Sequence, residues 1–242
     1  KLYTGNGSTQ SITGVGFQPD WVWIKERNNA ADHKLYDAVR GATKVLESSN
    51  TGAEGTDVNG LTAFDSNGFS LGSSGSNNGS GDTYASWNWK AGGTASSNTD
   101  GSITSNVSAN TTSGFSIIEY TGTGSTGTIA HGLNSAPELV ILRNREVASN
   151  WWVWGELLGN NQIMELDTTS AKYNPNGNYH NDTMPTSSVI SIGSDGQVSG
   201  SGQSHICYAF HSVKSFSKIG SYIGNGNADG TFVYTGFKPA FV

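Results

Sequence analysis

The chain has 242 residues, of which 112 are Gly, Ser, Thr or Asn, and only 13% are charged. These small polar residues disfavour helices, because they cost backbone entropy or offer the backbone competing hydrogen bonds, so coiled coils, helical bundles and Rossmann-type layers are excluded. Seven Trp, nine Tyr and nine Phe supply the apolar surface that a disordered chain lacks. The composition therefore predicts an all-β protein that folds.

Charge and hydropathy exclude two classes of partner. The net charge is −6, and no Lys or Arg lies between Ala91 and Leu142, so we expect no nucleic acid partner. The longest aliphatic run is four residues, whereas a membrane-spanning helix needs about 20, so we expect no membrane insertion. The start has neither an initiator Met nor a signal pattern, and we interpret the sequence as an excised or processed piece. Cys207 is the only cysteine, so no internal disulfide can support the fold.

A Tyr-x-Gly-x-Gly motif occurs three times and divides the chain into units. It begins at Tyr3, Tyr120 and Tyr222, and a proline follows each tyrosine after 16 or 17 residues. An apolar stretch then begins, and the three stretches are Trp21–Lys25, Leu139–Arg143 and Phe241–Val242. Glycine and Asn in the motif favour a tight turn, so the pattern predicts a hairpin followed by a buried strand.

A second pair of matching segments closes each unit. Phe69–Gly72 aligns with Ile190–Gly193, and the same register without gaps places Trp87–Trp89 on Tyr208–Phe210. Between these ends, Tyr36 and Leu46 can be aligned with Trp154 and Met164, but the surrounding residues agree poorly.

We therefore predict two tandem, related β-sandwich units of jelly-roll type, with the first hairpin of a third repeat at the C-terminus. The first unit spans residues 1–91, and residues 92–114 form a Ser/Thr/Asn/Gly-rich linker or an edge hairpin. The second unit spans residues 115–242 and includes the partial repeat, whose hairpin we expect to complete the sheet of that unit. The only helix candidate, residues 38–47, contains Gly41 and is interpreted as a turn between strands.

No catalytic constellation is recognisable, and we predict no enzyme activity, no cofactor and no metal. The five histidines, of which His205 and His211 flank a strand, are expected at surface or edge positions, and Cys207 is expected to be a small core residue. The acids available for catalysis are Asp57, Asp65, Asp82, Glu156, Glu165 and Asp167. We expect no position at which an acid in one unit corresponds to an acid in the other unit. Two Asp-x-Asn-Gly sequences superficially resemble calcium loops but lack the full spacing, so we interpret them as turns.

The tryptophans are the candidate binding residues, because indole rings stack on sugars as well as fill cores. Most tryptophan positions correspond to Leu, Ile, Phe or Tyr in the other unit, which favours the core. Trp151 and Trp152 are the best candidates for exposure and for ligand binding, since the run from Trp151 to Trp154 must place aromatic rings on both faces of a strand.

The motif Tyr-Thr-Gly-Asn-Gly-Ser-Thr together with Gly14–Lys25, Asp37–Ala42 and Ser217–Tyr222 resembles an uncharacterised tandem β-domain of marine bacteriophage structural and tail-fibre-like proteins. The resemblance implies a virion or extracellular location and a non-enzymatic structural module of a virion appendage, such as a tail fibre or surface protein. Its partners would be other virion or fibre subunits in a homo-oligomer. The alternative is a lectin-like adhesin that binds cell-surface glycans. The second unit lacks the Arg-Gly-Ala segment found at Arg40, which leaves any role of Arg40 open.

Overall fold

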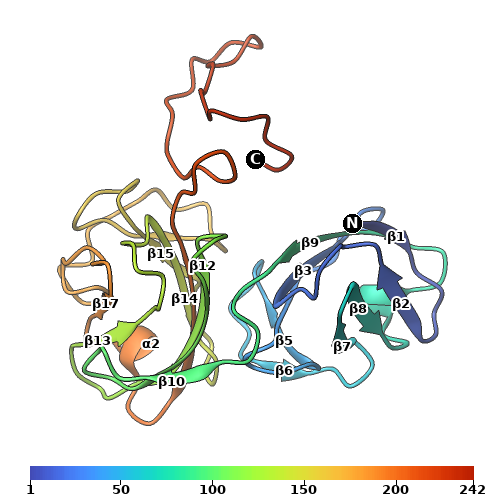
Figure 1. Cartoon of the computed structure of the whole chain (residues 1–242), viewed down its shortest axis with the longest axis horizontal. Helices are drawn as coiled ribbons and strands as arrows, with labels where there is room; N and C mark the ends of the chain where they lie inside the picture. The colour runs from blue at the N-terminus through green and yellow to red at the C-terminus, as the bar shows by residue number, and fades with distance from the viewer.

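The computed structural model describes residues 1–242 and consists of short antiparallel strands with two four-residue helices. Its strands gather into two lobes, each built from one large and one small sheet, and the large sheets face each other across the middle of the molecule (Figure 1). The all-β, sandwich-like architecture is as predicted.

The first unit contains a six-stranded sheet in the order β1-β9-β3-β4-β5-β6 and a three-stranded sheet in the order β2-β8-β7. The large sheet consists of β1 (Leu2–Thr4), β3 (Trp21–Glu26), β4 (Lys34–Asp37), β5 (Lys44–Glu47), β6 (Gly55–Thr56) and β9 (Thr83–Trp89). The small sheet consists of β2 (Gln10–Thr13), β7 (Leu61–Asp65) and β8 (Gly68–Leu71), and α1 (Gly75–Asn78) precedes β9. The segment predicted as a turn, residues 38–47, is a turn only over residues 38–43, because Lys44–Glu47 forms β5 and pairs with β4. The predicted turn around Asn67 lies between β7 and β8.

The second unit repeats this plan with a seven-stranded sheet in the order β10-β11-β12-β18-β14-β15-β16 and a two-stranded sheet of β13 and β17. The large sheet consists of β10 (Ser96–Asn98), β11 (Ser105–Asn110), β12 (Phe115–Thr121), β14 (Leu139–Asn144), β15 (Trp152–Trp154), β16 (Met164–Glu165) and β18 (Ser204–Phe210). The small sheet consists of β13 (Gly127–Ala130) and β17 (Val189–Ile192), and α2 (Gly196–Ser199) precedes β18. Strands β10 and β11 come from residues 92–114 and pair with each other, and β11 pairs with the edge of β12, so this segment forms an edge hairpin.

Strand register shows that the two units are structural repeats. Tyr3 lies opposite Tyr84 and Tyr120 lies opposite His205, so β1 meets β9 in the register in which β12 meets β18. Val22 and Val140, which occupy matching positions, face Tyr36 and Trp154 respectively. Leu35 pairs with Leu46 just as Val153 pairs with Met164. The middle alignment, which the sequence supported only poorly, is therefore correct.

Three apolar clusters fill the spaces between sheets. One cluster lies inside each unit, around Val22 and Ile24 in the first and around Val140 and Leu142 in the second. The third lies between the units and includes Trp21. Because successive side chains of a strand point to opposite faces, β3 and β14 bury both faces. This burial explains why Trp21–Ile24 and Leu139–Leu142 are apolar without alternation.

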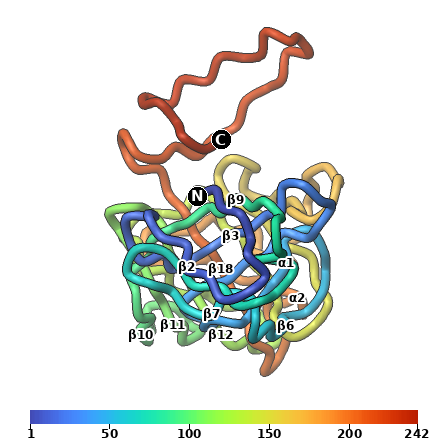
Figure 2. Tube along the Cα trace, turned by 90° about the vertical axis from the view of Figure 1, so that its right-hand side faces the viewer, coloured from blue at the N-terminus to red at the C-terminus, as the bar shows by residue number.

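The C-terminal segment, residues 214–242, contains no strand and loops out beyond the two units (Figures 1 and 2). Its end turns back, and Phe241 contacts Trp87 and Trp89 of the first unit. The expectation that its hairpin completes the sheet of the second unit is wrong, because its only backbone hydrogen bonds lie in a turn between Val213 and Ser217. The physical reason is that β12 and β13 already occupy the hairpin positions in that unit, and β11 covers the outer edge of β12.

Candidate functional site: the interface between the units

The two proposed binding residues lie inside the protein. The Trp151 side chain is 0% exposed and packs between the units, whereas Trp152 is 2% exposed and belongs to the core of the second unit. The expected exposure of one of these residues is therefore wrong, because the sheet that carries them is covered on both faces. Neither indole presents a ring face to solvent on which a sugar could stack.

Aromatic rings form the centre of the interface between the units. Trp21 of β3 stacks on Tyr208 of β18 with 4.4 Å between ring centroids, and it also stacks on Phe115 of β12 at 5.7 Å. Trp89 packs against Trp21 at 4.4 Å, and Phe115 against Phe210 at 4.7 Å. Large rings bury much apolar area each, so this cluster ties the two large sheets together.

A buried ion pair lies beside these rings. Asp37 ends β4, and its carboxylate accepts hydrogen bonds from the backbone N–H groups of Val39 and Arg40 and from the Arg40 Nε. The Tyr208 hydroxyl of the second unit donates to the same carboxylate at 2.6 Å. Burial raises the pKa of Tyr208 well above its usual value, so this hydroxyl stays protonated and acts as a donor. Arg40 also donates to the Tyr208 hydroxyl at 3.5 Å, so it has a structural partner in each unit.

Glu54 extends this pair into a network across the interface. Its carboxylate accepts from Arg40 of the first unit at 3.1 Å and from Arg145 of the second at 2.8 and 2.9 Å. Arg145 also contacts Glu119. Burial alone would raise the pKa of Glu54, but the hydrogen bonds and charges of Arg145 and Arg40 outweigh it, and the pKa lies below its usual 4.5.

Arg143 joins the units through backbone carbonyls. Its guanidinium is buried, lies 5.0 Å from the Trp151 ring, and donates to the carbonyl oxygens of Glu47, Asn50 and Gly52 in the first unit. The Trp151 Nε1 donates to the Glu47 carbonyl as well, at 2.7 Å. Burial lowers the Arg143 pKa to about 10, which leaves the group charged at neutral pH. These donors hold the loop after β5 against the second unit.

The recurring tyrosine motif binds a short helix in each unit. The Tyr3 hydroxyl donates to the Asn77 carbonyl of α1, and the Tyr120 hydroxyl donates to the matching Val198 carbonyl of α2. A Cβ at Gly5 would lie 2.1 Å from the Gly79 oxygen, and one at Gly122 would lie 2.4 Å from the equivalent oxygen of Gly200. The first glycine of the motif is therefore required by the close approach of two backbones.

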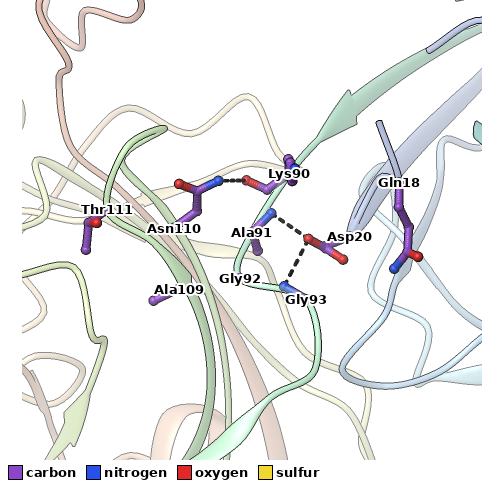
Figure 3. Close-up of a pocket in the computed structure, with 9 residues that line it drawn as sticks. All are labelled: Gln18, Asp20, Lys90, Ala91, Gly92, Gly93, Ala109, Asn110 and Thr111. Atoms are coloured by element: carbon purple, nitrogen blue, oxygen red, sulfur yellow. Dashed lines mark hydrogen bonds between the residues drawn. The ribbon is translucent and has the colours of Figure 1, made fainter. Parts of the chain in front are cut away.

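A matched pair of acids also has a structural role. Asp20 precedes β3 and accepts from the Ala91 and Gly93 N–H groups, and Glu138 precedes β14 and accepts from the Ser212 N–H and hydroxyl. Asp20 and Glu138 occupy equivalent positions, so the expectation that no acid matches an acid between the units is wrong. Asp20 lines an open recess of about 460 Å³ between the units, beside Lys90 and Asn110 (Figure 3).

Three of the five histidines and the single cysteine have buried side chains. His205, expected at an edge or surface, is fully buried and stacks on Tyr120 at 5.0 Å, and burial lowers its pKa to about 4. His131 and His180 are also buried, with lowered pKa values, so the surface expectation is wrong for these three residues. Cys207 lies in the core as predicted, and burial raises the pKa of its thiol.

The acids considered for catalysis are dispersed over both units. Asp57 accepts from Ser74, Asp65 from Ser70, Asp82 from Asn28, Glu165 from Thr168 and Tyr173, and Asp167 from the Trp151 N–H, while Glu156 is exposed. No group of three or more His, Cys, Asp or Glu residues is placed to hold a metal ion. None of the helices has the length and apolar character needed to cross a membrane.

Sequence reasoning missed the charged residues that join the units. Arg143 directly follows the four apolar residues that begin β14, and an Arg after such a run is a sequence signal for a buried charge that needs acceptors. Glu54 and Arg145 carry no comparable signal, because they lie in loops about 90 residues apart.

Comparison with known proteins gives one relationship. Neither the search of curated proteins nor the search of solved structures found a match. A family model described as a domain of unknown function, DUF7483, matches residues 1–242. The chain therefore belongs to the DUF7483 family.

Proposed function

We propose that this protein is a non-enzymatic structural module, a rigid two-unit block of an extracellular assembly such as a bacteriophage tail fibre or virion surface. The observation that supports this proposal is the interface, in which a cluster around Trp21 and Tyr208 and a charge network around Glu54 bridge the units. Units that move independently meet through smaller, more polar contacts, whereas a shared buried core opposes relative motion. The jelly-roll assignment of the units and their virion location remain predictions.

The mechanical half of the proposal is tested with the intact chain in solution. Small-angle scattering of the wild type should fit one fixed arrangement of the two units. Unfolding followed by fluorescence and by hydrogen exchange should show both units opening in a single cooperative transition. Two separate transitions, or a scattering profile that requires variable unit placement, would contradict the rigid block.

The biological half is tested by location. Antibodies against the chain should label an appendage or the surface of purified particles from the source that encodes it, and mass spectrometry of those particles should detect the protein. Labelling confined to the cytoplasm of the producing cell would overturn the assignment.

Glycan binding remains the alternative prediction. Trp151 and Trp152, the residues expected to form an exposed aromatic platform for sugars, are buried. Three other tryptophans, Trp23, Trp87 and Trp89, are each partly exposed. Binding of the wild-type chain to a glycan array, lost on Trp87→Ala, would replace the structural proposal with the adhesin.

A further inference from the structure

The open recess between the two units is lined mainly by polar groups (Figure 3). Gln18, Asp20 and Lys90 line it from the first unit, and Asn110 and Thr111, at the end of β11, line it from the second. Its volume of about 460 Å³ falls within the usual range for small-molecule sites. A small ligand in the recess would therefore contact both units.

Asp20 gives this recess a buried hydrogen-bond acceptor without a donor. The residue is 2% exposed, and its Oδ2 accepts from the Ala91 N–H at 2.8 Å and from the Gly93 N–H at 3.3 Å. Its Oδ1 is buried, has no hydrogen-bond partner and lies on the side of Gln18 (Figure 3). A buried polar atom without a partner is costly, so this oxygen is the position at which a donor from a ligand gains most.

The second unit shows which kind of donor is missing. Glu138 occupies the position equivalent to Asp20, and it accepts from the hydroxyl of Ser212 as well as from the backbone N–H of that residue. The ungapped match of the two units places Ala91 at the position of Ser212. The first unit therefore lacks the hydroxyl that the second unit supplies from its own chain, and a hydroxyl of a bound molecule can replace it.

The charges beside the recess favour a neutral ligand that carries hydroxyl groups. Burial raises the pKa of Asp20, while the positive charge of Lys90 and two backbone N–H donors act in the opposite direction. The ammonium group disfavours a bound cation, the carboxylate disfavours an anion, and only Ala91 and Ala109 offer apolar side chains. Because a hydroxyl both donates and accepts hydrogen bonds, a neutral sugar matches the carboxylate and the ammonium together.

We propose that this recess binds the terminal sugar residue of a glycan. One sugar hydroxyl donates to the Asp20 Oδ1, and another accepts from the Lys90 ammonium, which forms no ion pair within the chain. The exposed side chain of Gln18, which borders the carboxylate, turns aside to admit the ligand. The inference goes beyond the structural module because it adds a ligand site between the units, and this site needs no exposed tryptophan.

Titration of the intact chain with methyl glycosides tests the proposal. The panel contains the methyl glycosides of glucose, galactose, mannose, fucose and N-acetylglucosamine, and binding is followed by NMR of the isotope-labelled protein. At least one sugar should bind with a millimolar or lower Kd and shift the amide signals of Ala91 and Gly93, whose N–H groups donate to the same carboxylate. A panel in which no sugar binds, or in which signals shift only outside the recess, would overturn the proposal.

Asp20→Asn tests the role of the free oxygen. The Asn oxygen can still accept from the Ala91 and Gly93 N–H groups, whereas its amide nitrogen takes the place of Oδ1 and presents a donor instead of an acceptor. We expect the variant to stay folded and to bind the sugar at least about tenfold more weakly than the wild type. An unchanged affinity in the folded variant would contradict the proposed contact.

A blocking variant leaves the carboxylate untouched. Thr111 is exposed and lines the recess, so the indole of Thr111→Trp should fill it and weaken binding at least about tenfold. The neighbouring Thr112 is also exposed but does not line the recess, so Thr112→Trp is the matched control and should bind like the wild type. Equal affinities of the two variants would show that the sugar binds elsewhere.

The outcome is separable from the two functions considered above. Scattering without sugar measures the rigid two-unit block, and neither loss nor absence of sugar binding changes that measurement. Binding that is lost in Trp87→Ala and kept in Thr111→Trp would place the sugar on the partly exposed tryptophans and overturn the recess as its site.

Discussion

The indole N–H of Trp151 in the second unit donates to the backbone carbonyl of Glu47 in the first unit, with 2.7 Å between nitrogen and oxygen. Adjacent in sequence, Trp152 faces the other side of the sheet, and its indole nitrogen is buried without a hydrogen-bond partner. The two neighbouring indoles therefore differ in what they join: Trp151 couples the units, and Trp152 fills one of them.

This difference can be measured by removing each indole N–H. We expect Trp151→Phe to lower the free energy of unfolding by about 1–3 kcal/mol more than Trp152→Phe does. Trp151→Phe removes a buried hydrogen bond, whereas Trp152→Phe removes a donor that has no partner. Chemical denaturation gives both free energies of unfolding. Hydrogen exchange should show faster opening in the loop after Glu47 only for Trp151→Phe, and equal costs would contradict the coupling role.

Glu54 should make the interface sensitive to acid. Its pKa is lower in the folded protein than its usual 4.5, so its contribution to stability is present above about pH 4.5 and is lost as the pH falls through the folded pKa. At neutral pH, Glu54→Gln should lower the free energy of unfolding by about 1.5–3 kcal/mol, the usual range for hydrogen bonds to charged groups. The difference in free energy of unfolding between Glu54→Gln and the wild type should become smaller in denaturation curves recorded at decreasing pH below 4.5.

The exposed Glu156 provides the control for that titration. Glu156→Gln should change the free energy of unfolding by less than about 0.5 kcal/mol, as surface substitutions usually do. If the difference in free energy of unfolding between Glu54→Gln and the wild type stayed constant with pH, protonation of the Glu54 carboxylate would not be coupled to unfolding.

His205 should make a second, separate contribution at mildly acidic pH. Burial lowers its pKa from 6.5 to about 4, so between these values the unfolded chain binds a proton that the folded chain does not. Stability therefore falls as the pH drops from 6.5 to 4, by about 3 kcal/mol at 1.36 kcal/mol per pKa unit. His205→Phe should flatten this part of the pH profile, and an unchanged slope would show that the imidazole titrates normally.

Two glycines of the second unit should respond to alanine in opposite directions. Gly122→Ala brings a Cβ to 2.4 Å from the Gly200 oxygen, and we expect a loss of about 1–3 kcal/mol or more. Gly196, in the exposed first turn of α2, faces nothing within 4 Å, and Gly196→Ala should stabilise by about 0.4–1 kcal/mol. Thermal denaturation of the two variants is the measurement, and a tolerated Gly122→Ala would argue against the close backbone approach.

Cys207 should report opening of the second unit. Its thiol is buried, with a raised pKa, so an aromatic disulfide reagent should not react with the native protein. Labelling should accelerate with denaturant in parallel with loss of structure, whereas an added thiol at the exposed Ser170, in Ser170→Cys, should react at once. Rapid labelling of native Cys207 would show that this core opens locally.

Much of each unit was readable from the sequence because its signals are local or repeated. The tyrosine motif, the proline spacing and the matched ends of the units identified the repeat, and even the poorly supported match of Tyr36 with Trp154 agrees with the strand register. The same local reading failed at Trp151, since a ring that lies beside a second sheet and a ring that faces solvent have the same sequence signature.

The sequence by itself determined the fold class, the repeat and most of the turn positions, because glycine placement and strand periodicity act within a few residues. Only the tertiary structure decided that the large sheets face each other, that Arg143 finds its acceptors about 90 residues away, and that the third hairpin stays unpaired. The physical reason is that burial and hydrogen-bond partners depend on which surfaces meet, and two similar units can present the same strand face either to each other or to water.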